Sequence, residues 1–119
     1  MFDDGRPLFQ QIADLLADGI VAGRYAEDAQ VPSTNELAGF YRINPATVGK
    51  GVNVLVEQGV LHKRRGLGMF VSPGARDRLL SERTDRFRDD YVLPLLREAR
   101  QLGLTTPDIH RLIDQEDHS

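Results

Sequence analysis

The sequence contains no cysteine and no tryptophan, and only 7% of its 119 residues are aromatic. Without cysteine the chain has no disulfide bonds, thiolate nucleophiles or Cys-ligated zinc and iron–sulfur centres. This absence argues against a small secreted scaffold and favours a cytoplasmic protein. The start, MFDDGRPLFQ, lacks the pattern of a signal peptide, and no apolar run approaches the roughly 18 residues of a membrane span. We therefore expect no membrane partner.

A large excess of charge of one sign is also missing, since the formal net charge is −3. The total conceals an asymmetry along the chain. Residues 33–71 hold five cations against two anions, whereas the segments on either side are acidic. With 40% hydrophobic residues, the chain is large enough for one modest core and an appendage. Positive charge is thus concentrated in one segment, as in many nucleic-acid-binding domains.

That segment, 33–71, predicts two short helices and a hairpin in succession. Ser33 with Glu36 forms a capping box at the start of the first helix, and Asn44-Pro45 forms the start of the second. Apolar residues of the first helix are Leu37, Ala38 and Phe40. Those of the second, at helical spacing, are Val48, Val52, Leu55 and Val56. The second helix then presents to solvent Ala46, Thr47, Lys50 and Asn53, small and polar residues that suit a major groove.

A basic hairpin follows the second helix. Val60-Leu61 begins a strand, His62-Lys63-Arg64-Arg65 continues it, and Gly66-Leu67-Gly68 provides a tight reversal into Met69-Phe70-Val71. Cations beside such a tip are placed to meet phosphates, and Arg65 is nearest to it. An ordinary solvated run of charge is the alternative. The order helix, helix, hairpin is that of a winged helix-turn-helix.

The remaining segments predict helices. An apolar stripe from Leu8 to Val21 indicates a packing helix closed by Gly23, and Val31 is expected in a short strand beside the hairpin.

Ser72-Pro73-Gly74 marks a boundary, so we assign 6–74 to the first domain and 75–119 to a tail. Pro94 should kink the tail's first helix, and Thr106-Pro107 begins its second.

Two helices of this size form no core of their own, so we expect the tail to dimerise and a fragment ending at Gly74 to be a folded monomer. The predicted dimerisation residues are Leu79, Leu80, Phe87, Tyr91, Leu95 and Leu96. The fold class is therefore mainly α with a small β-hairpin wing: a winged helix-turn-helix domain followed by a short helical dimerisation tail.

Three stretches, PLFQQIADLLADGIVAGRY, VPSTNELAGFYRINPATVGKGVNVLVEQGVL and RRGLGMFV, resemble the DNA-binding domain of GntR-type bacterial transcription regulators. The Asn-Pro-x-Thr-Val start of the second helix and the short tail are similar to the YtrA-type branch. The resemblance implies dimerisation through the tail and, often, repression of an ABC-transporter operon. Because a two-fold dimer presents two recognition helices to successive major-groove faces, we expect a repressor that binds an inverted-repeat operator. The family's frequent arginines are replaced by Asn35 and Gly49, so the operator is expected to differ.

The predicted DNA-binding residues are Thr34, Asn35, Asn44, Ala46, Thr47, Lys50, Lys63, Arg64, Arg65 and Gly66. Of these, Asn35, Asn44, Thr47 and Lys50 are the candidates for base recognition. Thr34 and Asn35 start a helix that in such a fold often touches the DNA backbone. Gly49 and Gly51 weaken their helix by up to about 1 kcal/mol each relative to Ala, and we interpret them as positions of close approach to DNA.

Other functions have less support in the sequence. His110 and Asp114 are spaced as a metal pair but lack a third ligand, and we find no nucleophile arrangement or phosphate-binding glycine loop. We therefore expect no enzyme activity, no cofactor and no metal. Phe87, Tyr91 and Arg100 are candidates to bind a small-molecule effector, with simple dimer packing as the alternative. A protein-interaction module is the alternative to DNA binding, because the rest of the chain is acidic.

Overall fold

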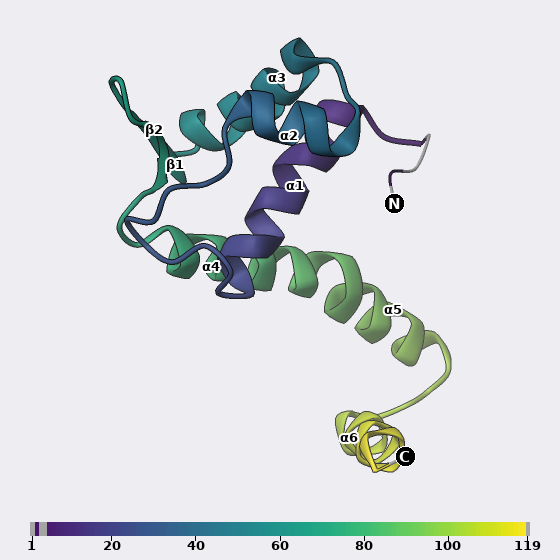
Figure 1. The fold of residues 1–119 in the computed structure, drawn as a ribbon. Helices are drawn as coiled ribbons and strands as arrows, with labels where there is room; N and C mark the ends of the chain where they lie inside the picture. The colour runs from purple at the N-terminus through teal and green to yellow at the C-terminus, as the bar shows by residue number, and fades with distance from the viewer. Residues whose placement is uncertain (1, 3–4, 119) are drawn as a thin grey trace. The chain divides into compact units, whose positions relative to one another are not determined.

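The computed structural model describes residue 2 and residues 5–118. Along the chain the elements are α1 (Leu8–Val21), α2 (Thr34–Tyr41), α3 (Pro45–Glu57), β1 (Leu61–Arg64), β2 (Gly68–Val71), α4 (Ala75–Phe87), the π-helical turn η1 (Arg88–Val92), α5 (Leu93–Gln101) and α6 (Thr106–Asp117). Figure 1 shows this order, with the antiparallel hairpin directly after α3. The predicted fold class is confirmed.

The chain forms two compact units, Met1–Ser81 and Glu82–Ser119. The first unit therefore extends beyond Gly74, where the sequence predicts its end. A break does occur at Gly74, since β2 ends at Val71 and a new helix begins at Ala75. The first turns of that helix nevertheless belong to the first unit.

The core of the first unit lies between α1, α2, α3 and the hairpin. Its most deeply buried side chains are Ile12, Leu16, Ile20, Val48, Val60, Leu61 and Val71. The stripes predicted for α1 and α3 supply most of them. On α2, the apolar residues Leu37 and Ala38 are buried, whereas Phe40, the third apolar residue of that helix, is 79% exposed and does not join the core. Its ring lies edge-on to Tyr41, with centroids 4.8 Å apart.

Helices α1 and α3 approach each other closely at Gly51 of α3. A Cβ placed there would lie 2.6 Å from the carbonyl oxygen of Phe9 and 3.0 Å from Cγ2 of Ile12, both on α1. Gly51 is also buried. The interpretation of Gly51 as a point of approach to DNA is therefore wrong. The absence of a side chain serves the contact between α1 and α3.

The hairpin carries a third short segment at its open edge. Gln30 forms an antiparallel bridge with Phe70, and Val31 donates a backbone hydrogen bond to Met69 at 3.0 Å. In place of the short strand expected at Val31, the structure has a single β-bridge at the preceding residue, Gln30. The Gln30 side chain also donates from Nε2 to the carbonyl oxygen of Leu67 at 2.7 Å, which ties the hairpin tip to this segment.

The start of α4 is fastened to the first unit by apolar and polar contacts. Ala75 and Leu79 belong to its core, with Leu79 only 4% exposed. Arg76 donates to the carbonyl oxygen of Val21 and Arg78 to that of Gln58, so both cap helix C-termini. The burial of Leu79 inside its own chain contradicts its assignment to the dimer interface.

The second unit contains the end of α4, η1, α5 and α6. Pro94 has no N–H and would clash with the carbonyl of Asp90, four residues earlier, in a regular helix. That carbonyl lies in the π-helical turn η1, which ends at Val92, two residues before Pro94. The kink predicted at Pro94 thus corresponds to a local change of helix type. Thr105 and Asp108 form a capping box at α6. Within residue 2 and residues 5–118, every helix is too short or too polar to span a bilayer.

Candidate nucleic-acid interface

The first candidate surface is the outer side of α3. Ala46, Lys50 and Asn53 are exposed and Thr47 is half-buried, while Val48 and Val52 point into the core. The outward pattern expected for this helix is therefore present. Asn44 caps α3, because its Oδ1 accepts a hydrogen bond from the N–H of Ala46 at 2.8 Å. This bond occupies one atom of the short side chain and leaves its amide NH₂ group available.

Lys50 is less open than its exposure suggests. Its Nζ lies 4.1 Å from the centre of the Phe9 ring on α1. A cation over an aromatic face is held by about 0.5–1 kcal/mol at an exposed site, which a phosphate or a base edge can displace. The close contact at Gly51 brings α1 to this position. A contact of Lys50 with DNA therefore competes with this cation–π contact.

The N-terminus of α2 lies beside α3. Ser33 donates its backbone N–H to Oε1 of Glu36 at 3.0 Å and accepts from the N–H of Glu36 through Oγ at 3.0 Å, as predicted. These contacts lower the pKa of the Glu36 carboxyl. Asn35 is exposed, whereas Thr34 is half-buried, with its methyl group 3.9 Å from a Cβ placed at Gly49. Asn35 is thus the more accessible of the two predicted contacts.

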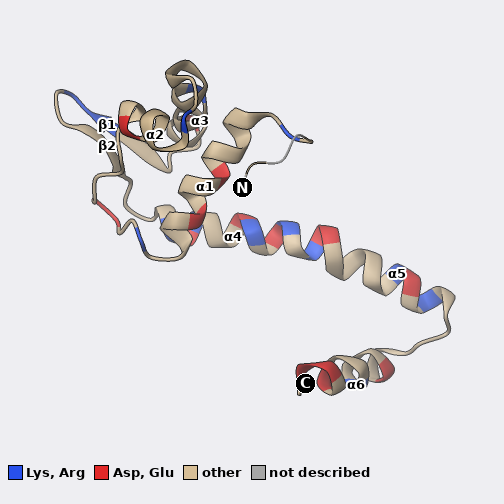
Figure 2. Cartoon of the chain, turned by 45° about the vertical axis from the view of Figure 1, so that its right-hand side comes forward, with Lys and Arg blue, Asp and Glu red and all other residues tan. Residues whose placement is uncertain are grey.

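The hairpin supplies the second candidate surface, and Figure 2 shows Lys and Arg along it. Lys63, Arg65 and Gly66 are exposed. Within the described part of the chain, the side chains of Lys63 and Arg65 form no ion pair. Arg64 is different, because it pairs with Asp28 and lies over the Phe70 ring. The three cations predicted to bind DNA are therefore unequal in the structure.

Several residues around these surfaces are absent from the prediction. Asp28 and Gln30 contact the hairpin from a segment that is distant in sequence, and Phe9 contacts Lys50 from α1. Such contacts leave no local signal in the sequence. Leu67 is 65% exposed at the hairpin tip between two glycines with positive φ, and the Gly-Leu-Gly pattern could have identified it.

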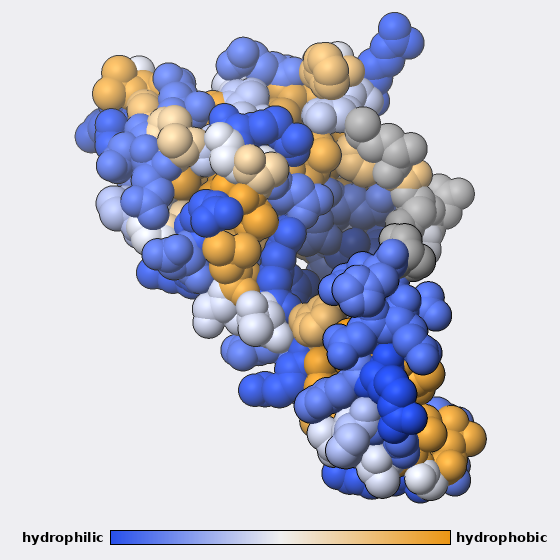
Figure 3. Space-filling view, turned by 90° about the horizontal axis from the view of Figure 1, so that it is seen from below, coloured by the Kyte–Doolittle hydropathy of each residue, from blue (hydrophilic) through white to orange (hydrophobic). Residues whose placement is uncertain are grey.

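The second unit exposes much of the predicted dimerisation face. Phe87, Tyr91 and Leu95 are exposed, and Leu96 is half-buried. The rings of Phe87 and Tyr91 lie 5.6 Å apart. Leu80, half-buried, lies at the end of the first unit. Figure 3 shows apolar residues open to solvent among hydrophilic ones on the face that it presents. Exposed apolar side chains in one small unit are typical of an interface.

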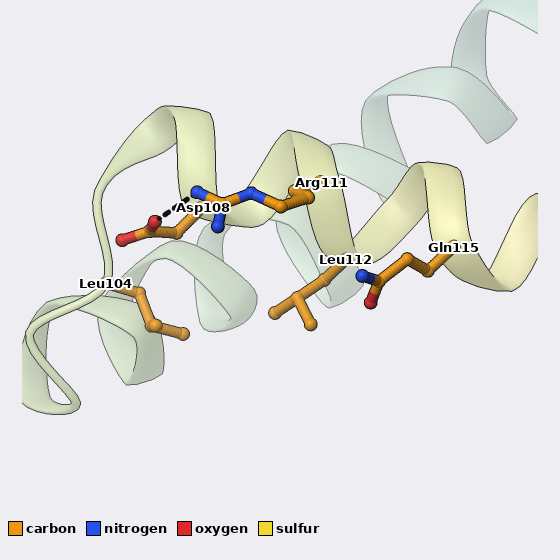
Figure 4. Close-up of a pocket in the computed structure, with 5 residues that line it drawn as sticks. All are labelled: Leu104, Asp108, Arg111, Leu112 and Gln115. Atoms are coloured by element: carbon orange, nitrogen blue, oxygen red, sulfur yellow. Dashed lines mark hydrogen bonds and ion pairs between the residues drawn. The ribbon is translucent and has the colours of Figure 1, made fainter.

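A hollow of about 270 Å³ lies on α6 and the loop before it. Its lining residues are Leu104, Asp108, Arg111, Leu112 and Gln115, and Figure 4 shows the ion pair between Asp108 and Arg111 at 2.8 Å. None of the three predicted effector residues lines this hollow. Phe87, Tyr91 and Arg100 are exposed, and their role in binding a ligand stays a prediction.

Comparison with known proteins gives one consistent result. The model of the family described as bacterial regulatory proteins, gntR family, matches residues 8–71, from the start of α1 to the end of β2. The chain is 25% identical to the HTH-type transcriptional repressor YtrA of Bacillus subtilis over 109 residues, which cover 92% of this chain and 83% of YtrA.

Solved structures are similar as well. A transcriptional regulator of the GntR family from Bacteroides thetaiotaomicron superposes with a TM-score of 0.78 at 31% identity, covering 93% of this chain and 96% of that one. The DNA-binding domain of AraR in complex with operator ORR3 gives a TM-score of 0.56 at 28% identity, covering 60% of this chain and 87% of that one. The shorter match corresponds in extent to the helix-turn-helix and wing.

Proposed function

This chain belongs to the GntR family of bacterial regulatory proteins, and from this premise we propose that it is a dimeric repressor that binds an inverted-repeat operator. DNA-binding transcriptional regulation is the function of the family. The observation that carries the proposal is the pairing of two surfaces in the first unit: the polar outer side of α3 and the hairpin with its open cations. Such a pair provides base contacts from a helix and phosphate contacts from a wing.

The division of roles follows from the side chains. Thr47 and Asn35 are short polar groups at helix starts, and each is able to exchange hydrogen bonds with a base edge or a phosphate. Lys63 and Arg65 are long cations without partners in the described structure, so phosphate is the contact that suits them. We assign sequence recognition to α3 and the start of α2, and positioning to the hairpin.

Dimerisation is supported by the exposed apolar residues of the second unit. Two copies that bury these residues would present two copies of α3 to successive major-groove faces, which requires a two-fold symmetric operator. Occupancy of such a site over a promoter blocks polymerase. The similarity to YtrA, a transcriptional repressor, supports repression of transcription over activation. A transporter operon is the target that the YtrA-type resemblance implies.

Selection of bound duplexes from a random pool with the purified protein tests this proposal. We expect an enriched palindrome whose half-sites are separated by one or more helical turns. A matched selection with the Thr47→Ala variant should lose information at defined positions of each half-site. Absence of enrichment at low salt would contradict the proposal and favour a protein-interaction module.

An effector site in the second unit is a further part of the proposal. Phe87 and Tyr91 form a tilted ring pair, and Arg100 adds a cation in the same unit. A ligand held by these groups would release DNA only if it bound the two dimer geometries with different affinity. Titration of the operator complex with a panel of small anions tests it, and unchanged operator affinity throughout would contradict it.

A further inference from the structure

Arg64 is the one hairpin cation that the described structure shows with an acidic partner. Its Nη2 lies 3.7 Å from Oδ1 of Asp28, and its guanidinium lies 4.2 Å from the centre of the Phe70 ring. The ring also faces His62, with the two centroids 6.2 Å apart. Arg64 is therefore held on the sheet from two sides, by a carboxylate and by an aromatic face.

The position of Asp28 is set by backbone hydrogen bonds to the hairpin. Asp28 donates its N–H to the carbonyl oxygen of Val71 at 2.8 Å, and Val71 donates to that of Ala29 at 2.9 Å. Asp28 also has a φ of 65°, in the left-handed region that Asp and Asn tolerate better than most residues. Its carboxylate is therefore placed beside Arg64 by the sheet, and the contact does not depend on a long, flexible acidic side chain.

This arrangement changes the charge that the wing offers to DNA. An exposed ion pair contributes little to stability, so stability is a weak reason for the contact. The contact bears instead on DNA binding, because each phosphate contact that a cation makes contributes about 0.9 to the dependence of log K on log salt. With Arg64 paired to Asp28, Lys63 and Arg65 are the hairpin cations that the described structure shows without an acidic partner.

We propose that Asp28 is a positioning residue that holds Arg64 away from DNA phosphates and thereby limits the affinity of the wing for DNA of every sequence. The inference rests on the proposed DNA-binding function and adds an internal competitor to it. A phosphate and the Asp28 carboxylate are both oxyanions, so they compete for the same guanidinium. Because the hairpin then contributes less to the affinity for DNA of any sequence, recognition of the operator depends more on the base contacts of α3.

The test is the Asp28→Asn variant, which preserves the shape of the side chain and its tolerance of a positive φ. Affinity is measured on the selected operator and on random duplex at several salt concentrations. We expect both affinities to rise by up to about fivefold, the limit that an exposed ion pair sets, and the salt slope to steepen by about one unit. The control is Asp85→Asn, which removes the same charge from an exposed position in the second unit and should leave both quantities unchanged.

A double-mutant cycle with Arg64→Ala separates competition from simple repulsion. In the wild-type background Arg64→Ala should have little effect on affinity or slope, because the side chain is already engaged. In the Asp28→Asn background it should remove the whole gain. A gain that persists without Arg64 would overturn the inference and assign the effect to direct repulsion between Asp28 and DNA.

A loss of affinity in Asp28→Asn would also overturn it, because Asp28 would then be orienting Arg64 toward phosphate. Unchanged affinity and slope in Asp28→Asn, with normal operator binding by the wild type, would reject the inference alone. Failure of the wild type to bind any duplex at low salt would reject the proposed function together with it. Thermal unfolding of each variant establishes that the compared proteins are equally folded.

Discussion

At the scale of single residues, the two glycines of α3 have opposite surroundings. A Cβ at Gly49 would meet only the methyl group of Thr34, at an ordinary 3.9 Å, whereas one at Gly51 would collide with the Phe9 carbonyl oxygen at 2.6 Å. Both positions are helical, so an alanine at either would gain the same helix propensity. Space alone distinguishes them.

We therefore expect Gly49→Ala to raise the free energy of unfolding by up to about 1 kcal/mol, through helix propensity. Gly51→Ala should lower it by about 1–3 kcal/mol, because α1 and α3 would have to separate. Urea denaturation of the two variants measures the difference. Equal changes in both would show that the contact between α1 and Gly51 is looser than its geometry indicates.

Single substitutions should also distinguish residues that position the protein on the DNA backbone from residues that recognise bases. Arg65→Ala should weaken binding to operator and random duplex alike and lower the salt slope by about one unit. Thr47→Ala should cost roughly 1–3 kcal/mol on the operator and much less on random DNA. Titrations of both variants on both duplexes decide the matter. An equal loss for Thr47→Ala on the two duplexes would exclude base reading by this residue.

At the scale of elements, the start of α2 depends on a titratable cap. Hydrogen bonds from Ser33 lower the pKa of Glu36 in the folded protein. A lowered pKa means that the contribution to stability is present above the pKa of the unfolded chain and is lost as the pH falls through that of the folded one. The relevant range thus lies at and below the ordinary glutamate pKa of about 4.3.

Glu36→Gln preserves an acceptor for the N–H of Ser33 but removes the titration. We expect the unfolding midpoint of this variant to fall less between pH 6 and pH 3 than that of the wild type. Asp77→Asn, in the first turn of α4 and without a capping box, is the matched control for charge. A parallel decline in the wild type and Glu36→Gln would show that the carboxylate of the cap does not contribute.

At the scale of the whole molecule, the first unit ends at Ser81, and a truncated chain has to include this end to keep the whole core. A fragment ending at Gly74 lacks Ala75 and Leu79, both buried in the core. Loss of a buried leucine side chain typically costs about 2–5 kcal/mol, a large part of the stability of a small domain. The expectation that a chain cut after Gly74 folds well therefore needs revision.

We predict that a fragment ending at Ser81 folds as a monomer, while one ending at Gly74 is markedly less stable. Because it lacks the second unit, the longer fragment should bind the operator on the order of 10²-fold more weakly than the full chain. Light scattering and thermal unfolding measure assembly and stability. A full-length chain that is monomeric at micromolar concentration would contradict the role given to the second unit.

The sequence by itself determined the local elements. Capping residues, helical periodicity and glycine turns are signals that extend over only a few residues of sequence. Ser33 and Asn44 therefore identify the starts of their helices, and Gly66 the hairpin turn, without knowledge of the tertiary structure. The basic hairpin after two short helices can likewise be predicted from the sequence, and this order of elements supports the resemblance to the GntR family. These features depend on hydrogen bonds and spacings that the tertiary fold leaves unchanged.

Only the tertiary structure decided how those elements use their side chains. It assigned Gly51 to the contact with α1, Leu79 to the core and Arg64 to Asp28, whereas the sequence pattern favoured DNA or a dimer for each. The physical reason is that burial and ion pairing depend on which distant segment lies opposite. Asp28 lies far from Arg64 along the chain, and only the hydrogen bonds between its segment and β2 bring the two together.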